Sequence, residues 1–274
     1  TPQILMLSGI GPADHLKAHG IDVIVDRPAV GADLQDHIDY VASFQTDGDV
    51  FNGTTFSASI RFLKSVFQWR SKRTGTLTTP YAESGGFAKT RADVTVPDVQ
   101  FHFVPAMLED HGRESVSGAG YSIHVCVLRP HSRGTVRLAS ADPMAAPLID
   151  PNFLDDDRDM QVLRDGVKLV HRIAAAPALA KHQGVDRHAT PLDDDAALDH
   201  LIRSRADTVY HPVGTARMGS DDQAVCDPHL RVRGVEGLYI ADASVMPRLV
   251  SGNTNAPSIM IGERCADFVK ADLG

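Results

Sequence analysis

The chain has 274 residues, which is enough for one large domain or two smaller domains with their own hydrophobic cores. Its formal net charge of −8 argues against nucleic-acid binding, because the chain as a whole would repel phosphate groups. No apolar run is long enough to span a bilayer, and the three cysteines contain no CxxC pair, which argues against a disulfide framework.

The first 20 residues predict two short helices, residues 2–7 and 13–19, joined by a Gly-rich turn. Residues 21–25 are apolar and β-branched and predict a strand. The chain opens with Thr1 and enters a helix at once, so we expect further residues to precede it in the natural protein.

Short β-prone runs and helical segments alternate from about residue 38 to residue 204. The predicted strands are residues 40–44, 98–104, 121–128 and 134–138, and the predicted helices are residues 57–69, 157–174 and 193–204. Strands mixed with separate helices indicate an antiparallel sheet covered on one side.

A different pattern begins at about residue 205. Residues 238–241 predict a short buried strand that ends at Asp242, and residues 255–270 predict a helix. A strand, a polar loop and a helix form the unit of a doubly wound sheet. We therefore expect an α+β chain: a substrate domain with a mixed or antiparallel sheet flanked by helices, plus N-terminal and C-terminal parts of an α/β domain.

His211 is the first candidate for chemistry. It precedes Pro212, which disfavours a helical backbone, and nearby glycines allow close approach to another group. A histidine held against a flat cofactor could act as a base near neutral pH. Taken alone, a structural loop histidine is the commoner explanation, since the chain has 13 histidines.

Asp242 and Asn255 are two further candidates. Asp242 follows the predicted buried strand, where open α/β sheets bind ligands, and could accept a hydrogen bond from a sugar-like hydroxyl. Asn255 opens the last predicted helix, whose N-terminal N–H groups could stabilise a ring oxygen that gains negative charge. Taken alone, a turn cap and a helix N-cap explain these two residues equally well.

Together, and in this order, these segments resemble the glucose–methanol–choline (GMC) oxidoreductase family over the whole chain. Residues 1–12 are similar to its second signature, residues 30–37 to its VGxNLQDH loop with Asp33 in place of Asn, and residues 142–154 to its DP…P.IDPNYL stretch. Residues 250–257 resemble the choline dehydrogenase-like and long-chain alcohol dehydrogenase-like branch. Ala216 and Arg217 stand where many relatives have Cys and Lys, and we expect these changes to alter packing, not chemistry.

The resemblance implies a FAD-dependent enzyme that oxidises an alcohol to an aldehyde by hydride transfer to flavin N5. His211 would take the hydroxyl proton and Asn255 would hold the substrate oxygen. Asp242 and Ala243 would contact the ribityl–pyrophosphate part of FAD, and Asn255 and Ala256 the pyrimidine edge of the flavin.

The resemblance also implies a domain division. Residues 1–37 and 205–274 would belong to the FAD-binding domain, and residues 38–204 would form the substrate-binding domain. Glu83 would face the substrate cavity, where an acid pairs with a quaternary ammonium in choline-oxidising relatives. An acid that is simply common in E-x-G-G-F segments of this branch is the alternative.

The Gly-rich dinucleotide fingerprint of the family is absent from these residues, so the main FAD-binding fold is missing from this chain. We therefore expect a fragment of a longer protein, inactive by itself. Its expected partners are an alcohol substrate, the missing amino-terminal FAD-binding segment, a quinone or oxygen as electron acceptor, and a second copy in a homo-oligomer. The expected location is the cytoplasm or the periphery of the inner membrane.

Two alternatives stay open at this point. The chain could be a non-catalytic binding or assembly fragment. It could also belong to a flavin photodecarboxylase-like enzyme, which needs a Cys and an Arg beside the flavin; Cys126 lies near Arg129 in the sequence but not next to it. His211 and Asn255 favour alcohol oxidation.

Overall fold

The computed structural model describes residues 1–48, 50–109, 112–114 and 116–274. The chain divides into two compact units. Unit 1 consists of Thr1–His37, Leu128–Asp159 and Thr208–Gly274, and unit 2 of Ile38–Val127 and Met160–Asp207.

Unit 1 takes in a middle segment that the expected division placed in the substrate-binding domain. Leu128–Asp159 joins the two ends of the chain because its backbone pairs with them. The N–H of Val136 donates to the Gly31 carbonyl at 2.7 Å, and Leu34 and Gly134 exchange two hydrogen bonds of 3.0 and 2.9 Å. These contacts join residues about 100 positions apart, which sequence periodicity does not report.

Unit 1 is built from short elements joined by long ordered loops. Its elements are α1 (Pro2–Leu7), β1 (Ile10–Gly11), α2 (Ala13–Ala18), β2 (Val25–Asp26), β7 (Thr135–Arg137), β8 (Leu148–Asp150), the 3₁₀ helix η3 (Ala243–Val245) and α7 (Asn255–Leu273). β1 pairs with β2 in parallel and β7 with β8 antiparallel. Met6 of α1, Leu16 of α2 and Ile261 of α7 pack into one hydrophobic cluster, so the two ends of the chain share a core.

The helices predicted in unit 1 are present, but the strands are shorter than predicted. The strand expected at residues 21–25 reduces to Val25–Asp26, because only this part meets Ile10–Gly11. The strand expected at residues 238–241 reduces to an isolated bridge between Arg231 and Tyr239. A strand needs a partner along its length, and among the described residues this segment pairs only briefly.

Unit 2 is organised around a six-stranded sheet. The strands are β3 (Ile38–Thr46), β4 (Ser84–Ala88), β5 (Val99–Val104), β6 (Ala119–Val127), β9 (Val185–Asp186) and β10 (Asp207–Thr208). Thr208, the last residue of β10, is counted with unit 1. The order is β10-β3-β6-β5-β4, with β9 also paired to β3. The ladders of β3 with β6, β5 with β6, and β4 with β5 are antiparallel, which confirms the predicted α+β class.

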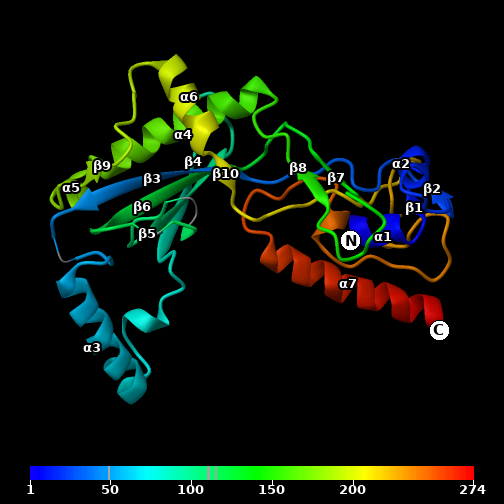
Figure 1. Cartoon of the computed structure of the whole chain (residues 1–274), viewed down its shortest axis with the longest axis horizontal. Coiled ribbons are helices and arrows are strands. Elements are labelled where there is room, and N and C mark those ends of the chain that lie inside the picture. Colours follow the sequence, from blue (N-terminus) through cyan, green and yellow to red (C-terminus); the bar gives the residue numbers. More distant parts are fainter. Residues whose placement is uncertain (49, 110–111, 115) are drawn as a thin grey trace. The chain divides into compact units, whose positions relative to one another are not determined.

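Helices cover one face of this sheet (Figure 1). They are α4 (Asp157–Ala174), α5 (Pro177–Ala180) and α6 (Asp195–Arg205). α4 packs tightly because Gly166 has no side chain: a Cβ there would lie 2.8 Å from Cγ2 of Val125 on β6. Leu198 and Ile202 of α6 are fully buried.

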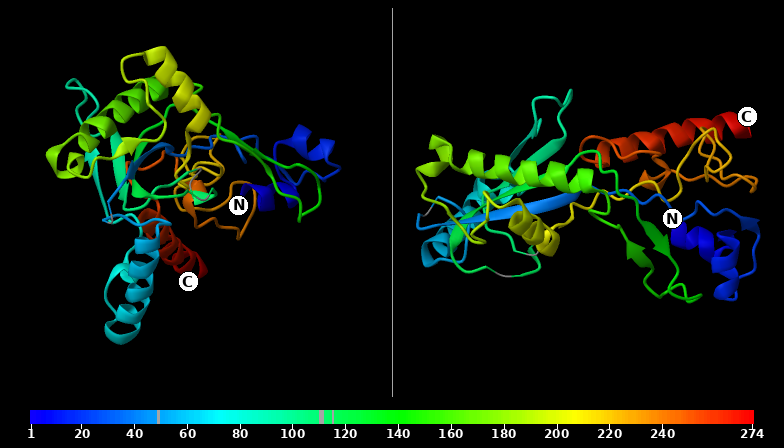
Figure 2. Two further views of the ribbon diagram at one scale, coloured as in Figure 1. Left: turned by 60° about the vertical axis from the view of Figure 1, so that its left-hand side comes forward. Right: turned by 90° about the horizontal axis from the view of Figure 1, so that it is seen from above.

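The remaining helix of unit 2, α3 (Phe56–Lys72), projects away from the sheet (Figure 1 and Figure 2). The apolar residues that give this segment its helical spacing are largely exposed: Ile60, Leu63 and Phe67 are 41%, 58% and 64% exposed. Its main packing partner in unit 2 is the short 3₁₀ helix η1 (Thr76–Thr78). In the described parts of the chain, no helix has the length and apolar character needed to cross a membrane.

Candidate active site

Two loops of unit 1 that are far apart in the sequence pair with each other. The backbone of Gln35 donates to the Val213 carbonyl at 3.0 Å, and Val213 donates back at 2.8 Å. The Gln35 side chain donates to the Pro247 carbonyl at 3.3 Å and accepts from the Leu249 N–H at 3.1 Å. Gln35 thereby holds residues 30–37, 211–215 and 247–249 together through its backbone and its side chain.

A glycine allows these loops to approach closely. Gly214 has φ +92°, and a Cβ there would lie 2.3 Å from the carbonyl oxygen of Asp33. Any other residue at position 214 would strain the backbone and push the loops apart. The close contact between Gly214 and the Asp33 carbonyl therefore explains why the segment at residues 211–215 needs Gly at this position.

Two departures from the family pattern meet in the same place. Arg217, which replaces Lys, has its Nε 3.3 Å from an oxygen of Asp33, which replaces Asn. Arg217 also makes hydrogen bonds of 2.9 and 2.8 Å to Asp221. The two replacements therefore form an ion pair with each other.

His211 is buried, with 9% of its surface exposed, and both its backbone and its ring are held. Its backbone N–H donates to Asp36 at 2.8 Å, and Asp36 also accepts a hydrogen bond from the Thr208 hydroxyl. Its Nδ1 lies 2.9 Å from Nδ1 of His37, with the two rings nearly perpendicular. Its Nε2 lies 3.5 Å from the amide nitrogen of Asn253.

The start of α7 provides the features expected for an electron-rich ring. Asn255 and Ala256 are its first two residues, both are exposed, and the N-cap residue Thr254 makes no side-chain capping hydrogen bond. The first N–H groups of a 19-residue helix are thus without a side-chain cap, at the positive end of the helix dipole.

Asp242 is half-buried at the start of η3, next to Ala243. Burial by itself would raise its pKa, but hydrogen bonds from the Ser244 backbone N–H at 2.7 Å and the Thr1 hydroxyl at 2.5 Å outweigh burial and lower the pKa. The Ser244 hydroxyl is buried and has no hydrogen-bond partner among the residues that the structure describes. An anionic carboxylate beside an unsatisfied hydroxyl suits a bound group rich in hydroxyls.

Glu83 belongs to unit 2, where it is exposed directly before β4. The photodecarboxylase alternative involves Cys126 and Arg129. Cys126 is fully buried in β6 of unit 2. Arg129 belongs to unit 1 and donates to the Ser251 hydroxyl at 2.9 Å. All three cysteines, Cys126, Cys226 and Cys265, are buried.

Unit 2 contains a buried ion pair that sequence analysis did not find. The Nδ1 of His124 lies 2.6 Å from the carboxylate of Asp39, which is fully buried. Burial lowers the pKa of His124, but the adjacent carboxylate outweighs burial and raises the pKa. The neighbouring His102 has a lowered pKa because burial dominates there.

We expect Asp39→Asn to destabilise the protein more at pH 6 than at pH 9. The raised pKa of His124 contributes stability that is present below about pH 6.5 and is lost as the pH rises through the folded-state value. Loss of the charged partner should cost about 1–3 kcal/mol at pH 6, measured as a shift in Tm. The exposed Asp93→Asn is the matched control. An equal shift at both pH values would contradict this account.

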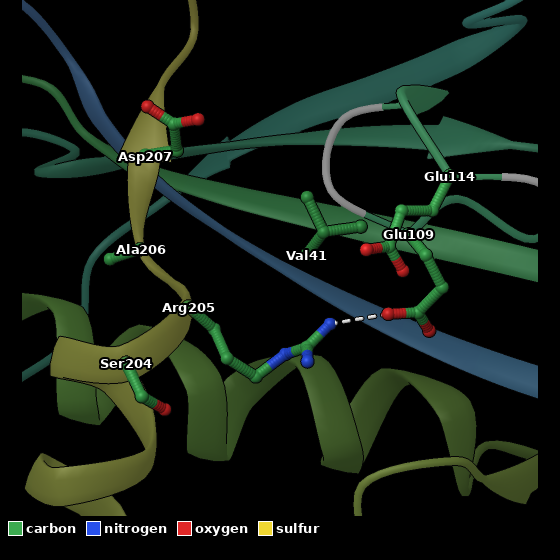
Figure 3. A pocket seen from close by; sticks show the side chains of 7 residues that line it. All are labelled: Val41, Glu109, Glu114, Ser204, Arg205, Ala206 and Asp207. Carbon is green, nitrogen blue, oxygen red and sulfur yellow. Dashed lines mark hydrogen bonds and ion pairs between the residues drawn. The ribbon is translucent and has the colours of Figure 1, made fainter.

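Two pockets lie in unit 2. One, of about 400 Å³, is apolar and lies between Phe101, Phe103 and Ile123 of the sheet and Ile173 and Leu179 of the helices. Its lining includes Ser84, the residue after Glu83. The other is polar, and Figure 3 shows its lining, with Arg205 paired to Glu109 at 2.6 Å.

Sequence reasoning missed the residues that hold His211. His37 and Asp36 were read only as part of the VGADLQDH resemblance, and Asn253 only as part of the loop before α7. The available signal was the pair of adjacent polar residues Asp36 and His37, but His211 lies 174 residues from His37 in the sequence.

Comparisons with known proteins show which family the chain resembles. A family model described as GMC oxidoreductase matches residues 130–262. An alcohol dehydrogenase [acceptor] of Pseudomonas putida is 48% identical over the whole chain and 50% of its own length. Human mitochondrial choline dehydrogenase is 42% identical over 98% of the chain and 46% of its own length.

Solved structures show the same fold. A variant of formate oxidase from Aspergillus oryzae superposes with a TM-score of 0.88 at 29% identity, over 99% of this chain and 52% of that one. Pyridoxine 4-oxidase from Mesorbium loti gives a TM-score of 0.79 at 27% identity, over 97% of this chain and 48% of that one. The chain spans about half the length of the curated relatives it matches.

Proposed function

We propose that this chain, which belongs to the GMC oxidoreductase family, forms the carboxy-terminal half of a FAD-dependent enzyme that oxidises an alcohol to an aldehyde. The observation that carries this proposal is the buried His211, fixed through its backbone by Asp36 and through its ring by His37. The loop that leads into α7 supplies the Asn253 amide beside it.

The first task of these residues is to remove a proton. An alkoxide gives up a hydride far more readily than an alcohol does. His211 takes the hydroxyl proton on Nε2, the ring nitrogen that does not face His37. General-base help of this kind contributes about 10²–10⁴-fold to a rate.

The second task is to stabilise the oxygen as it gains charge. Asn255, at the exposed first position of α7, donates its amide N–H to that oxygen. Its helix terminus adds a positive partial charge. Loss of one such donor costs roughly 10²–10³-fold in kcat.

FAD, when bound, supplies the acceptor for the hydride. The residues of unit 1 fit such a group: Asp242 and Ala243 would hold the ribityl–pyrophosphate part, and Asn255 and Ala256 the pyrimidine edge of the ring. The anionic Asp242 with the unsatisfied Ser244 hydroxyl, and the N-terminus of α7 that lacks a side-chain cap, support this assignment.

The 274-residue chain by itself should be colourless and inactive. It contains no Gly-rich dinucleotide fingerprint to cradle the pyrophosphate, so the contacts above would be most of what it offers FAD. The measurement is a visible spectrum of the purified chain, with its intact mass, before and after addition of FAD. A stable yellow preparation of this chain alone, with flavin absorption, would refute the expectation.

A panel of alcohols with a dye acceptor, run on the complete enzyme, tests the proposed function and narrows the substrate. We propose Glu83 as a residue that faces the substrate; choline in the panel asks whether this acid pairs with a quaternary ammonium. A second series with oxygen or a quinone as acceptor separates oxidase from dehydrogenase. Absence of turnover with every alcohol, or light-driven release of CO₂ from a fatty acid, would overturn the proposal.

A further inference from the structure

The protonation state of His37 follows from its surroundings. The ring is fully buried, and its Nε2 lies 3.2 Å from the carbonyl oxygen of Leu128 and 3.0 Å from that of Val250. Carbonyl oxygens only accept hydrogen bonds, so the Nε2 of His37 must carry a hydrogen and donate. In a neutral imidazole the other nitrogen, Nδ1, then presents a lone pair.

That lone pair decides the tautomer of His211. The two Nδ1 atoms are 2.9 Å apart, and one of them must carry the hydrogen between them. Since Nδ1 of His37 is the acceptor, Nδ1 of His211 is the donor. The Nε2 of a neutral His211 is therefore left with a lone pair.

Asn253 supports the same assignment from the opposite side of the ring. Its amide nitrogen, which can only donate, lies 3.5 Å from Nε2 of His211. This contact is at the long limit of a hydrogen bond and fits an acceptor at Nε2. It agrees with the tautomer that follows from the contacts of His37.

A charged His37 would reverse this arrangement. With both of its nitrogens protonated, His37 would donate to Nδ1 of His211 and move the hydrogen of His211 to Nε2. Burial opposes such a cation. Asp36, the residue before His37, accepts from the backbone N–H of His211 and from the Thr208 hydroxyl. The ring nitrogens of His37 contact two neutral carbonyls and a second imidazole.

We propose that His37 is a positioning residue that keeps the proton of His211 on Nδ1, so that Nε2 is the base. This inference rests on the proposed function. When Nε2 takes the proton, the O–H bond of the alcohol breaks, an Nε2–H bond forms, and His211 becomes an imidazolium. Its Nδ1–H still donates to His37, so the same hydrogen bond serves both states without rearrangement.

Two substitutions of His37 in the complete enzyme separate positioning from packing. The Oδ1 of His37→Asn can stand near the former Nδ1 and accept from His211, whereas His37→Leu fills similar space without an acceptor. We expect His37→Leu to lower kcat by about 10²-fold or more with little change in KM, because His211 would no longer be held in the tautomer that leaves Nε2 unprotonated. His37→Asn should recover most of that loss.

The direct readout is ¹⁵N NMR of histidine-labelled enzyme, assigned with His211→Gln, because the ¹⁵N shifts report which ring nitrogen carries the proton. His211 should carry it on Nδ1 in the wild type and in His37→Asn, and on Nε2 in His37→Leu. FAD absorbance and Tm verify that each variant is folded and loaded.

Two results would overturn the inference: a wild-type His211 protonated on Nε2, or a folded, FAD-loaded His37→Leu with near-normal kcat. If both variants fail to fold, the wild-type spectrum decides alone. Because that spectrum needs no turnover, it stays informative even if no alcohol is oxidised, an outcome that would count against the proposed function instead.

Discussion

His211→Ala in the complete enzyme is expected to lower kcat with the best alcohol by about 10²–10⁴-fold and to leave FAD bound. The loss follows because the variant lacks the imidazole whose Nε2 takes the hydroxyl proton. Steady-state kinetics with a dye acceptor, at a pH where the wild type is fully active, measure the effect.

The cofactor content decides what such a loss means. Val213 holds the loop through two backbone hydrogen bonds with Gln35 that alanine at 211 does not remove, so flavin absorbance per mole of protein should stay at the wild-type value. His211→Gln is a second variant that keeps a polar side chain without a base, and it should be nearly as slow as alanine. Near-normal turnover in either variant would refute the assignment of the base.

Asn255→Ala is expected to lower kcat by roughly 10²–10³-fold. The amide is assigned to the oxygen that becomes negative as the proton leaves, so its contribution grows toward the transition state, and KM should change less than kcat. Steady-state kinetics of the complete enzyme measure both constants.

Asn253→Ala is the matched control, because it removes an amide from the same loop. Asn253 contacts His211 only at 3.5 Å, so its loss should cost clearly less than that of Asn255. A larger effect at Asn253 than at Asn255 would mean that Asn253, and not Asn255, binds the substrate oxygen.

Local pattern carried much of the fold. The helical spacing and flanking residues predicted α4 at Asp157–Ala174 and most of α7, because amphipathic periodicity is written within a single helix. Three strands of the sheet in unit 2, namely β3, β5 and β6, were predicted within a few residues, whereas β4, β9, β10 and the strand order were not predicted. The antiparallel β3–β6 pair joins segments about 80 residues apart, and turn signals do not record such pairings.

The pattern failed where an element depends on a partner. Residues 238–241 have a strand-like composition, yet Tyr239 makes only an isolated bridge. The apolar residues of α3 have helical spacing, yet Phe67 is 64% exposed. In both cases composition shows which residues a segment could bury. Whether it buries them depends on how other segments pack against it.

By itself, the sequence predicted which residues carry the chemistry: His211 and Asn255 stand in segments whose order and residues resemble one family of oxidoreductases. It did not determine the state of those residues. The orientation of His211, and the nitrogen on which its proton sits, depend on His37 and on the carbonyls of Leu128 and Val250, which come from three distant parts of unit 1. A tautomer is set by hydrogen-bond partners in space, so only the tertiary structure could decide it.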